Sequence, residues 1–382
     1  MIDTAYFNLP AIDRLRDRVS IPDATEHPAV AQLRLDADAA LKAGPYSVTD
    51  AQRLALVPNP DPHDYRSFGP YWWPNPNTPD GLPYVVRDGI SNPDALKGNH
   101  DDLQAMSQAV QKLTLAYRLF GNDFYAAHAA RLLRTWFLDP STAMNPNMKY
   151  AQGIPGGPIG RCFGLIDTNT VPYLLDSIAF LSGSRHWTSV DQQGLRDWFK
   201  RLCDWFTTDP MALEEETQPN NHGTSYRQQV ARFAVFAGDI ELAKKTVARV
   251  GERDIAHLNP DGSQPRELRR TRSYDYSTFN ARMLLSQALL SRQLGVDLTS
   301  YSSPQGATLC KMVDWFEPYV GHFDRWPQQQ ILEFQPAALA WVLRLASLVF
   351  NDAKYEQWLS RLTEPGVLSN LFQLQFPALN PT

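Results

Sequence analysis

A helical hairpin recurs along this chain of 382 residues, and that recurrence restricts the possible folds more than any other feature. Apolar residues repeat with a helical period from Asp101 to Phe120, and a second helical segment runs from Phe124 to about Leu138. The turn between them is built from glycine, asparagine and aspartate, which commonly end helices. Comparable hairpins begin near residues 170, 222, 276 and 336. The chain is therefore predicted to be all-α. The turns rich in glycine, asparagine and aspartate that join the two helices of a hairpin lie at Phe120–Asp123, Phe236–Asp239, Leu294–Asp297 and Phe350–Asp352.

The length and regularity of the loops between the hairpins distinguish two possible all-α architectures. Stacked helical pairs form either an open solenoid or a closed toroid. A solenoid keeps a tight period with short loops, whereas the loops here are long and irregular and strand signals are weak. We therefore predict one domain over residues 1–382, an (α/α) toroid or incomplete barrel of helical hairpins with its long loops at one end. The expected loops are 139–168, 209–221, 251–275 and 321–335.

Residues 57–99 carry no helical or strand period and are rich in proline. An Asp80-Gly81 pair marks a turn, and an aromatic cluster stands at Tyr71, Trp72 and Trp73. Loops of this length inside a domain are commonly lids or binding loops. The alternative is a structural wrap whose aromatic side chains fill the core. We predict a lid or binding segment.

Charge and cysteine content exclude several classes of protein. The net charge is −5, with 36 Lys and Arg against 41 Asp and Glu, so a nucleic-acid partner is not expected. Cys162, Cys203 and Cys310 are odd in number and far apart, which predicts neither a disulfide framework nor a zinc site. No apolar run reaches the roughly 18 residues that a membrane span requires. Residues 1–20 also lack the apolar core of a signal peptide.

Two carboxamides and an imidazole stand together at a predicted helix start, in the run Asn220-Asn221-His222. Either asparagine is suited to cap the helix, with His222 in its first turn. A helix start presents free backbone N–H groups, and side-chain donors beside them suit an anion. The alternative is an ordinary helix cap with a hydrogen-bonded histidine.

Four arginines occupy seven positions in the third polar loop, and the loop ends at Tyr276, which is predicted to open the next helix. On an acidic protein, such local positive charge suggests the capture of an acidic ligand. A solvated charged turn is the alternative. A further polar loop holds Tyr150, Gln152 and Asn169. The four arginines are Arg266, Arg269, Arg270 and Arg272.

Other chemistries find little support in the sequence. Nucleophile-elbow, zinc-protease and P-loop motifs are absent. His63 and His100 lie near aspartates, but their spacing fits no metal-ligand set, so neither a metal nor a cofactor is expected. Glu214–Glu216 would offer carboxylates for glycoside hydrolysis, yet three consecutive residues cannot all point inward. A solvated face is the better interpretation of that run.

Taken in order, the polar loops resemble the alginate lyase family, which are helical-toroid polysaccharide lyases acting on uronic acid polymers. Gly223 after Asn-Asn-His makes the chain more similar to the mannuronan- and glucuronan-cleaving branch than to the bacterial alginate-export lyases, which have a bulkier residue there. The matching segments are Tyr71–Pro76, Asp80–Tyr84, Arg87–Gly89, Tyr150–Gln152, Ile154–Gly156, Gly164–Thr168, Asn220–Gly223 and Asp261–Pro265 through Tyr276–Ser277.

The resemblance implies roles for individual residues. Asn221 would neutralise the substrate carboxylate, and His222 would act as base or neutraliser. Arg270, or else Arg269, would hold the carboxylate, and Tyr276 would be the acid and a second candidate for the base. The residues implied to bind substrate are Tyr71, Trp72, Trp73, Tyr150, Gln152, Asn169, Asn220, Arg266, Arg269 and Arg272.

The implied reaction explains why such residues would be needed. A lyase removes the C5 proton of a uronate, which is barely acidic beside a negative carboxylate. Preorganised donors stabilise the enolate-like state by about 3–4 kcal/mol each, so charge neutralisation does not require a metal. Arginine and imidazolium favour the phenolate of a nearby tyrosine, which makes it a better base.

Mannuronate and glucuronate share their configuration at C4 and C5, so the catalytic residues suit polymannuronate and β-1,4-glucuronan equally. The expected partner is an acidic polysaccharide, and the expected location is periplasmic or secreted with a leader trimmed ahead of Met1, or else cytoplasmic. Two alternatives remain at this point. One is an α/α-toroid glycoside hydrolase with paired carboxylates, and the other is a non-catalytic uronan-binding protein.

Overall fold

The predicted turn chemistry is visible in the hairpin of α4 (His100–Phe120) and α5 (Asp123–Phe137). The α4 helix ends at Gly121, whose φ of 67° lies in the left-handed region that favours glycine. The Asn122 side chain then accepts a hydrogen bond from the Phe124 backbone N–H and caps α5. Leu103, Met106, Val110 and Leu113 are buried along one face of α4, which packs against α5. The hairpin prediction is confirmed.

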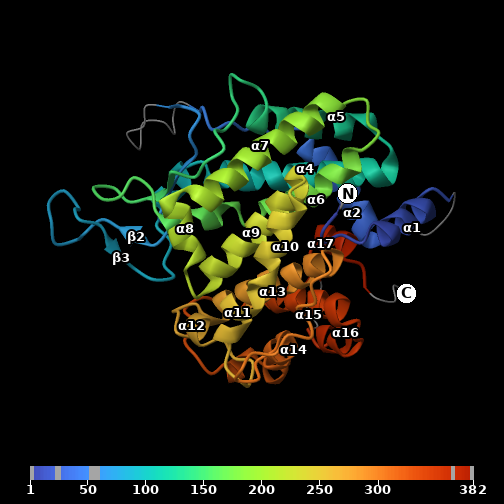
Figure 1. Ribbon diagram of the computed structural model, residues 1–382. Helices are drawn as coiled ribbons and strands as arrows, with labels where there is room; N and C mark the ends of the chain where they lie inside the picture. Colours follow the sequence, from blue (N-terminus) through green and yellow to red (C-terminus); the bar gives the residue numbers. More distant parts are fainter. Residues whose placement is uncertain (1–3, 22–26, 51–60, 363–365, 379–382) are drawn as a thin grey trace. The chain divides into compact units, whose positions relative to one another are not determined.

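The computed structural model describes residues 4–21, 27–50, 61–362 and 366–378 (Figure 1). These residues are mostly helical and fall into two compact units. The first unit comprises Met1–Leu33, Gln218–Arg232 and Asp239–Thr382, and the second comprises Arg34–Thr217 and Phe233–Gly238. The single domain predicted over 1–382 stays a prediction.

The second unit is built on α4 and α5 together with α6 (Val171–Ile178), α7 (Ser189–Thr208) and α8 (Pro210–Glu216). A capping box fixes the start of α7, in which Thr188 and Asp191 exchange hydrogen bonds. Edge-on and tilted aromatic contacts form its core, and their large apolar area stabilises the unit. The ring pairs are Phe137–Trp198, Phe137–Phe199, Phe199–Phe233, Phe199–Phe236 and Phe206–Phe233.

The α8 helix lies in a segment expected to be loop, and it corrects the interpretation of the glutamate run. Asp209 caps its start by accepting from the Met211 N–H, with Pro210 at its first position. Only Glu214 is exposed, while Glu215 is fully buried. The helical turn rotates consecutive side chains to different sides, so a uniformly solvated face is wrong for Glu214–Glu216.

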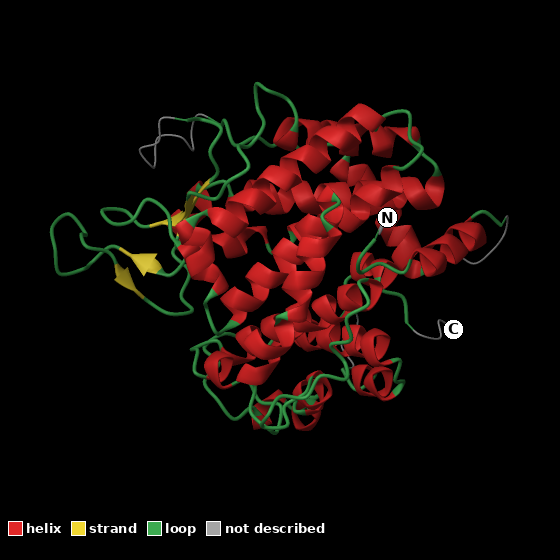
Figure 2. Cartoon of the chain, in the orientation of Figure 1, coloured by secondary structure: helices red, strands yellow, loops and turns green. Residues whose placement is uncertain are grey.

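Four short strands form two ladders in the second unit, drawn in yellow in Figure 2. The parallel ladder pairs β1 (Arg66–Phe68) with β4 (Tyr150–Gly153), and the antiparallel one pairs β2 (Trp72–Trp73) with β3 (Val85–Val86). Residues 57–60 of the predicted lid segment lie outside the described residues. Residues 61–99 of that segment do contain regular structure, because β1, β2 and β3 lie there. Strands of two or three residues are too short for an alternating pattern to show.

The first unit centres on α13 (Ser273–Gln293), which packs against α15 (Pro336–Phe350), as Figure 1 shows. The α15 helix ends at Asn351 with φ 51°, and Gly295 follows α13 with φ 75°, so two further predicted turns have the expected left-handed residue. The other helices here are α1 (Leu9–Val19), α10 (Ile240–Ala248), α11 (Val250–Arg253), α12 (Pro265–Leu268), α14 (Leu309–Asp314), α16 (Lys354–Leu359) and α17 (Asn370–Gln375). The α2 helix (Pro28–Ala40) and the α9 helix (Asn221–Ala237) each contribute residues to both units.

The α13 helix begins at Ser273, three residues before the predicted start. A bridge between Arg272 and Gln330 holds the chain just ahead of it, and the Ser273 backbone N–H and hydroxyl both donate to the Gln329 carbonyl. These contacts come from a distant segment, which the local sequence does not reveal. Tyr276 therefore lies within the first turn of α13 rather than at its opening. In the described part of the chain, no helix is long and apolar enough to cross a membrane.

Candidate active site

The first turn of α9 is set by Asn220, which resolves the choice between the two asparagines. Its side-chain oxygen accepts a hydrogen bond from the His222 backbone N–H at 3.1 Å, as a helix cap does. Asn221, the first helical residue, is fully buried, and His222 is half-buried. Gly223 leaves no room for a side chain, because a Cβ there would lie 2.0 Å from the Gln218 carbonyl oxygen. A glycine is thus required for this turn to close.

Asn221 is held by a residue that the sequence interpretation missed, Glu267 of α12. One Glu267 carboxylate oxygen accepts from the Asn221 backbone N–H at 2.8 Å, and the other accepts from Asn221 Nδ2 at 2.7 Å. Glu267 is 2% exposed, so this pair is shielded from water. The amide nitrogen carries two hydrogens, of which Glu267 takes one. Glu267 went unnoticed because it lies inside the arginine-rich run.

Arg270 and Tyr276 form the second contact of the site. Arg270 Nη2 donates to the Tyr276 phenol oxygen at 2.8 Å, and the guanidinium carbon lies 3.7 Å from the centroid of the tyrosine ring. Both side chains are half-buried, so they are supported by the protein and still reach solvent. A guanidinium that donates to a phenol oxygen favours the phenolate over the phenol.

The Glu267 carboxylate links these two contacts electrostatically. Burial raises its pKa, while the hydrogen bonds from Asn221 and the positive charges of His222 and Arg270 act in the opposite direction. His222 and Arg270 are therefore within electrostatic reach of the same carboxylate that holds Asn221. Since Arg270 also contacts Tyr276, the four predicted catalytic residues are connected through Glu267 and Arg270. Their individual roles stay predictions.

The other arginines of the cluster differ in their surroundings. Arg272 forms an ion pair with Asp275, at 2.8 Å between Nε and Oδ2. Arg266 and Arg269 are exposed. Arg270 contacts the Tyr276 phenol, whereas Arg269 is exposed, and this favours Arg270 over Arg269 as the carboxylate-binding group.

The remaining predicted binding residues belong to the second unit. Gln152 is buried with φ 49°, and its side chain donates to Asp167 Oδ1 at 2.9 Å and accepts from Arg161 Nη2 at 3.1 Å. The Asn169 side chain donates to the Ile166 carbonyl at 2.6 Å. Both amides are therefore engaged in hydrogen bonds within the protein, and their contact with substrate stays a prediction. Tyr150 is half-buried in β4.

The aromatic cluster of the second unit is partly accessible. Tyr71, Trp72 and Trp73 are each half-buried, the two tryptophans on β2. Arg87 lies over the Trp73 ring at 4.9 Å, and Arg161 lies over the Trp72 ring at 5.5 Å. Ring faces of this kind suit the stacking of sugars, as predicted for these three residues.

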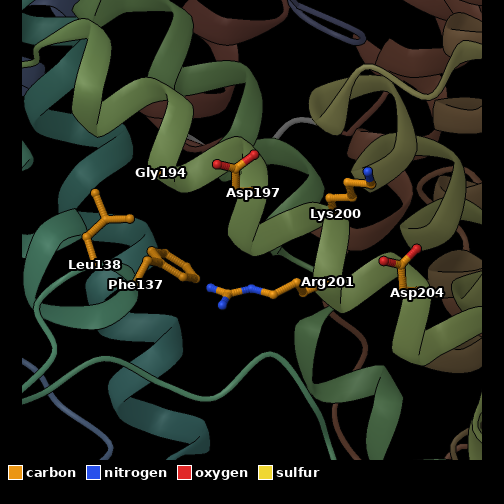
Figure 3. A pocket seen from close by; sticks show the side chains of 7 residues that line it. All are labelled: Phe137, Leu138, Gly194, Asp197, Lys200, Arg201 and Asp204. Atoms are coloured by element: carbon orange, nitrogen blue, oxygen red, sulfur yellow. The ribbon is translucent and has the colours of Figure 1, made fainter.

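Each of the two units has a hollow in its surface. A small one in the first unit is lined by Asn220, Arg266 and Glu267 together with His257 and Asn280, so it adjoins the start of α9. A larger one of about 540 Å³ lies on α7, and Figure 3 shows its lining side chains. Its charges are mixed, and it contains none of the predicted site residues. Within the described ranges, no group of three or more His, Cys, Asp or Glu side chains is placed to hold a metal ion. The lining of the larger hollow is Phe137, Leu138, Gly194, Asp197, Lys200, Arg201 and Asp204.

The chain is similar to known proteins over nearly its whole length. Its sequence matches the family model for alginate lyase over residues 48–326. A crystal structure of an alginate lyase from Bacteroides ovatus is 36% identical, with a TM-score of 0.93 and 99% of each chain covered. No curated protein matches the chain.

More distant structures share the fold. Alginate lyase A1-III from Sphingomonas species A1 is 17% identical, with a TM-score of 0.61 over 98% of this chain and 96% of that one. A variant of A1-III in complex with a tetrasaccharide is 16% identical, with a TM-score of 0.62 over 100% of this chain and 99% of that one. The fold class is accordingly the all-α (α/α) toroid. The chain belongs to the alginate lyase family and is a polysaccharide lyase.

Proposed function

We propose that this lyase cleaves a β-1,4-linked uronic acid polymer, polymannuronate in alginate or β-1,4-glucuronan, by β-elimination. The observation that carries the mechanism is the 2.8 Å hydrogen bond from Arg270 Nη2 to the Tyr276 phenol oxygen. It favours the phenolate, and the phenolate is the form of tyrosine able to remove a proton from carbon.

The reaction starts at C5 of a uronate unit. Asn221, His222 and Arg270 donate to its carboxylate and stabilise the dianionic, enolate-like state that forms when the C5 proton leaves. Each such donor contributes about 3–4 kcal/mol in related oxyanion sites. Tyr276 takes the C5 proton, and the electrons of the C5–H bond form the C4=C5 double bond as the C4–O4 bond breaks. Tyr276 then returns the proton to the departing O4.

Glu267 has a supporting part in this scheme. A carboxylate that accepts from both the backbone N–H and the side chain of Asn221 fixes which way the amide faces. The Glu267 carboxylate holds Asn221 Nδ2, rather than Oδ1, toward itself. It thereby sets the direction of the second N–H of the Asn221 amide. That N–H is the group required to neutralise a substrate carboxylate.

The relatives support the substrate class. The similar protein from Bacteroides ovatus is an alginate lyase, and A1-III has been solved with a tetrasaccharide bound. Gly223 adds the glucuronan-cleaving branch as a candidate. We also propose a periplasmic or secreted location, because such polymers are too large to cross a membrane unaided. Fractionation of the native host, followed by activity assays on each fraction, tests the location.

The test of function is a substrate panel of polymannuronate, polyguluronate, glucuronan and glycosaminoglycans, read by ultraviolet absorbance and product sizing. We expect unsaturated products from polymannuronate or glucuronan. Saturated reducing ends without ultraviolet absorbance would indicate hydrolysis, and tight binding without new ends would indicate a uronan-binding protein. Either result would contradict the proposal.

Variants of His222 decide which residue is the base. His222→Gln retains a hydrogen-bond donor and loses the ability to take a proton. We expect it to keep measurable turnover if His222 neutralises the carboxylate, as proposed here. Turnover as low as that of His222→Ala would transfer the role of base from Tyr276 to His222.

A further inference from the structure

Arg161, in the second unit, lies beside the predicted sugar-stacking aromatics and was assigned no role from the sequence. Its guanidinium donates to the Gln152 carbonyl through Nε at 2.9 Å and to Gln152 Oε1 through Nη2 at 3.1 Å. It lies over the ring of Trp72 at 5.5 Å and over that of Phe163 at 5.4 Å. One edge of the guanidinium is thus fixed, and two aromatic rings lie near it.

The charge of Arg161 is not balanced by a direct ion pair with any carboxylate in the described part of the chain. Asp167 and Glu215 act on it only through space, and burial lowers its pKa. Two other partly or fully buried arginines do have such partners, in the pairs Arg134–Asp191 and Arg227–Asp254. A partly desolvated cation without a counter-ion is costly, so its retention calls for an explanation.

The outer edge of the guanidinium is available to a ligand. Among the described residues, none accepts a hydrogen bond from Nη1, and Nη1 is not among the buried polar atoms that lack a partner. It therefore faces solvent. The Trp72 indole N–H also has no acceptor among the described residues and is not a buried polar atom without a partner, so it too is accessible. The Trp73 indole N–H, in contrast, donates to the Ile90 carbonyl at 2.9 Å.

Gly69 lies beside the side chains of both Arg161 and Trp72. A Cβ placed on this glycine would lie 3.0 Å from Arg161 Nη2 and 3.3 Å from Trp72 Nε1. A Cβ would also lie 2.6 Å from Trp72 Cδ1, so the absence of a side chain at residue 69 allows Trp72 and Arg161 to approach the backbone and each other closely. Arg161 Nη1 and the Trp72 indole N–H thus belong to neighbouring side chains, and each offers a donor to an acidic group such as a carboxylate.

We propose that Arg161 and the Trp72 indole N–H form a binding subsite for a carboxylate of the uronan chain. The proposal rests on the proposed function for the identity of the polymer. Its chemistry is recognition of an acidic sugar, with the carboxylate on the two donors and the sugar ring beside the Trp72 indole. The subsite holds the polymer and takes no part in proton transfer.

The experiment compares four variants in steady-state kinetics on the polymer that the wild type cleaves. Arg161→Gln is expected to raise KM about tenfold or more with kcat within about twofold, because it removes a charge-assisted contact. Trp72→Phe keeps a ring but loses the N–H, and a KM increase of about threefold to tenfold is expected. Arg161→Lys keeps the charge without the fork and should fall between Arg161→Gln and the wild type.

Arg131→Gln is the matched control, because it removes the same charge from an exposed position on α5 and should leave KM unchanged. A purely structural Arg161, bracing Gln152, would make the Lys variant as defective as the Gln variant and lower both melting temperatures. That result overturns the subsite, as does a loss in kcat with KM unchanged. If Arg161→Gln does not fold, an unaltered KM for Trp72→Phe also overturns it.

Calorimetric titration with saturated uronan oligosaccharides separates this proposal from the proposed function. The titration uses the Tyr276→Phe variant, so that the ligand is not consumed. Weaker binding after the additional Arg161→Gln change supports the subsite even if the wild type cleaves no uronan. Equal affinity with and without that change contradicts the subsite even if the wild type is an active lyase.

Discussion

Replacing Glu267 by glutamine tests the buried support of Asn221 with little change in shape. The two carboxylate oxygens accept from the Asn221 N–H at 2.8 Å and from Nδ2 at 2.7 Å. Glutamine keeps one acceptor and sets an NH₂ group against the other Asn221 donor. A hydrogen bond to a charged group contributes about 1.5–3 kcal/mol. If that amount is lost from the orientation of Asn221 in the transition state, kcat/KM falls about 10- to 100-fold.

The pH dependence of Glu267→Gln supplies a second readout. Burial raises the pKa of Glu267, so the folded protein holds its proton more tightly than the unfolded chain. The contribution of Glu267 to stability is therefore greatest at low pH and decreases as pH rises from the usual glutamate value through the raised pKa. Activity should have the opposite trend, because protonation below the raised pKa occupies one of the oxygens that hold Asn221.

The assay measures initial rates by ultraviolet absorbance across pH, alongside melting curves. Glu267→Gln should lack the decline in kcat/KM on the acid side that Glu267 causes in the wild type. Glu252→Gln, an exposed position on α11, is the matched control and should behave like the wild type. The reasoning is refuted if Glu267→Gln keeps wild-type kcat/KM and the same acid limb.

Three further substitutions test the local structure around the site. Asn220→Ala removes the cap of α9 and should lower the free energy of unfolding by about 1 kcal/mol in urea titrations, and an unchanged midpoint would argue against the cap. Gly223→Ala places a Cβ against the Gln218 carbonyl, so we expect a loss of about 1–3 kcal/mol and lower activity from the displaced helix start, whereas wild-type melting and turnover would show that the turn adapts. Asp254→Ala leaves the buried Arg227 without its carboxylate and should cost about 3–5 kcal/mol in unfolding, while a loss below about 1 kcal/mol would mean that the pair is not a significant support.

Local chemistry explains what could be predicted of the fold. The hairpin turns depend on short-range requirements, such as a left-handed residue at Gly121 and a capping side chain at Asn122. Elements that depend on distant partners were missed. The β1 strand pairs with β4 across more than 80 positions of sequence, and the start of α13 is fixed by Gln329 and Gln330. Short helices such as α12 have too few residues for a period to be visible.

The residues of the candidate site also fall into two groups, those that the sequence predicts and those that depend on contacts with distant segments. Asn221, His222, Arg270 and Tyr276 could be predicted as site residues because their order along the chain resembles a known family. Glu267 and Arg161 could not, because each is defined by contacts with a segment elsewhere in the sequence. A buried glutamate within an arginine-rich run looks like part of a charged turn until its partner is seen. An arginine that lies near two aromatic rings likewise cannot be recognised from the linear sequence.

The most direct test of the central claim is the ultraviolet absorbance of products from polymannuronate and glucuronan, measured for the wild type and for Tyr276→Phe. The account predicts that the wild type forms unsaturated uronate ends and that Tyr276→Phe, which keeps the ring and loses the phenol oxygen bound by Arg270, forms almost none. Unsaturated ends produced by Tyr276→Phe at the wild-type rate would contradict it.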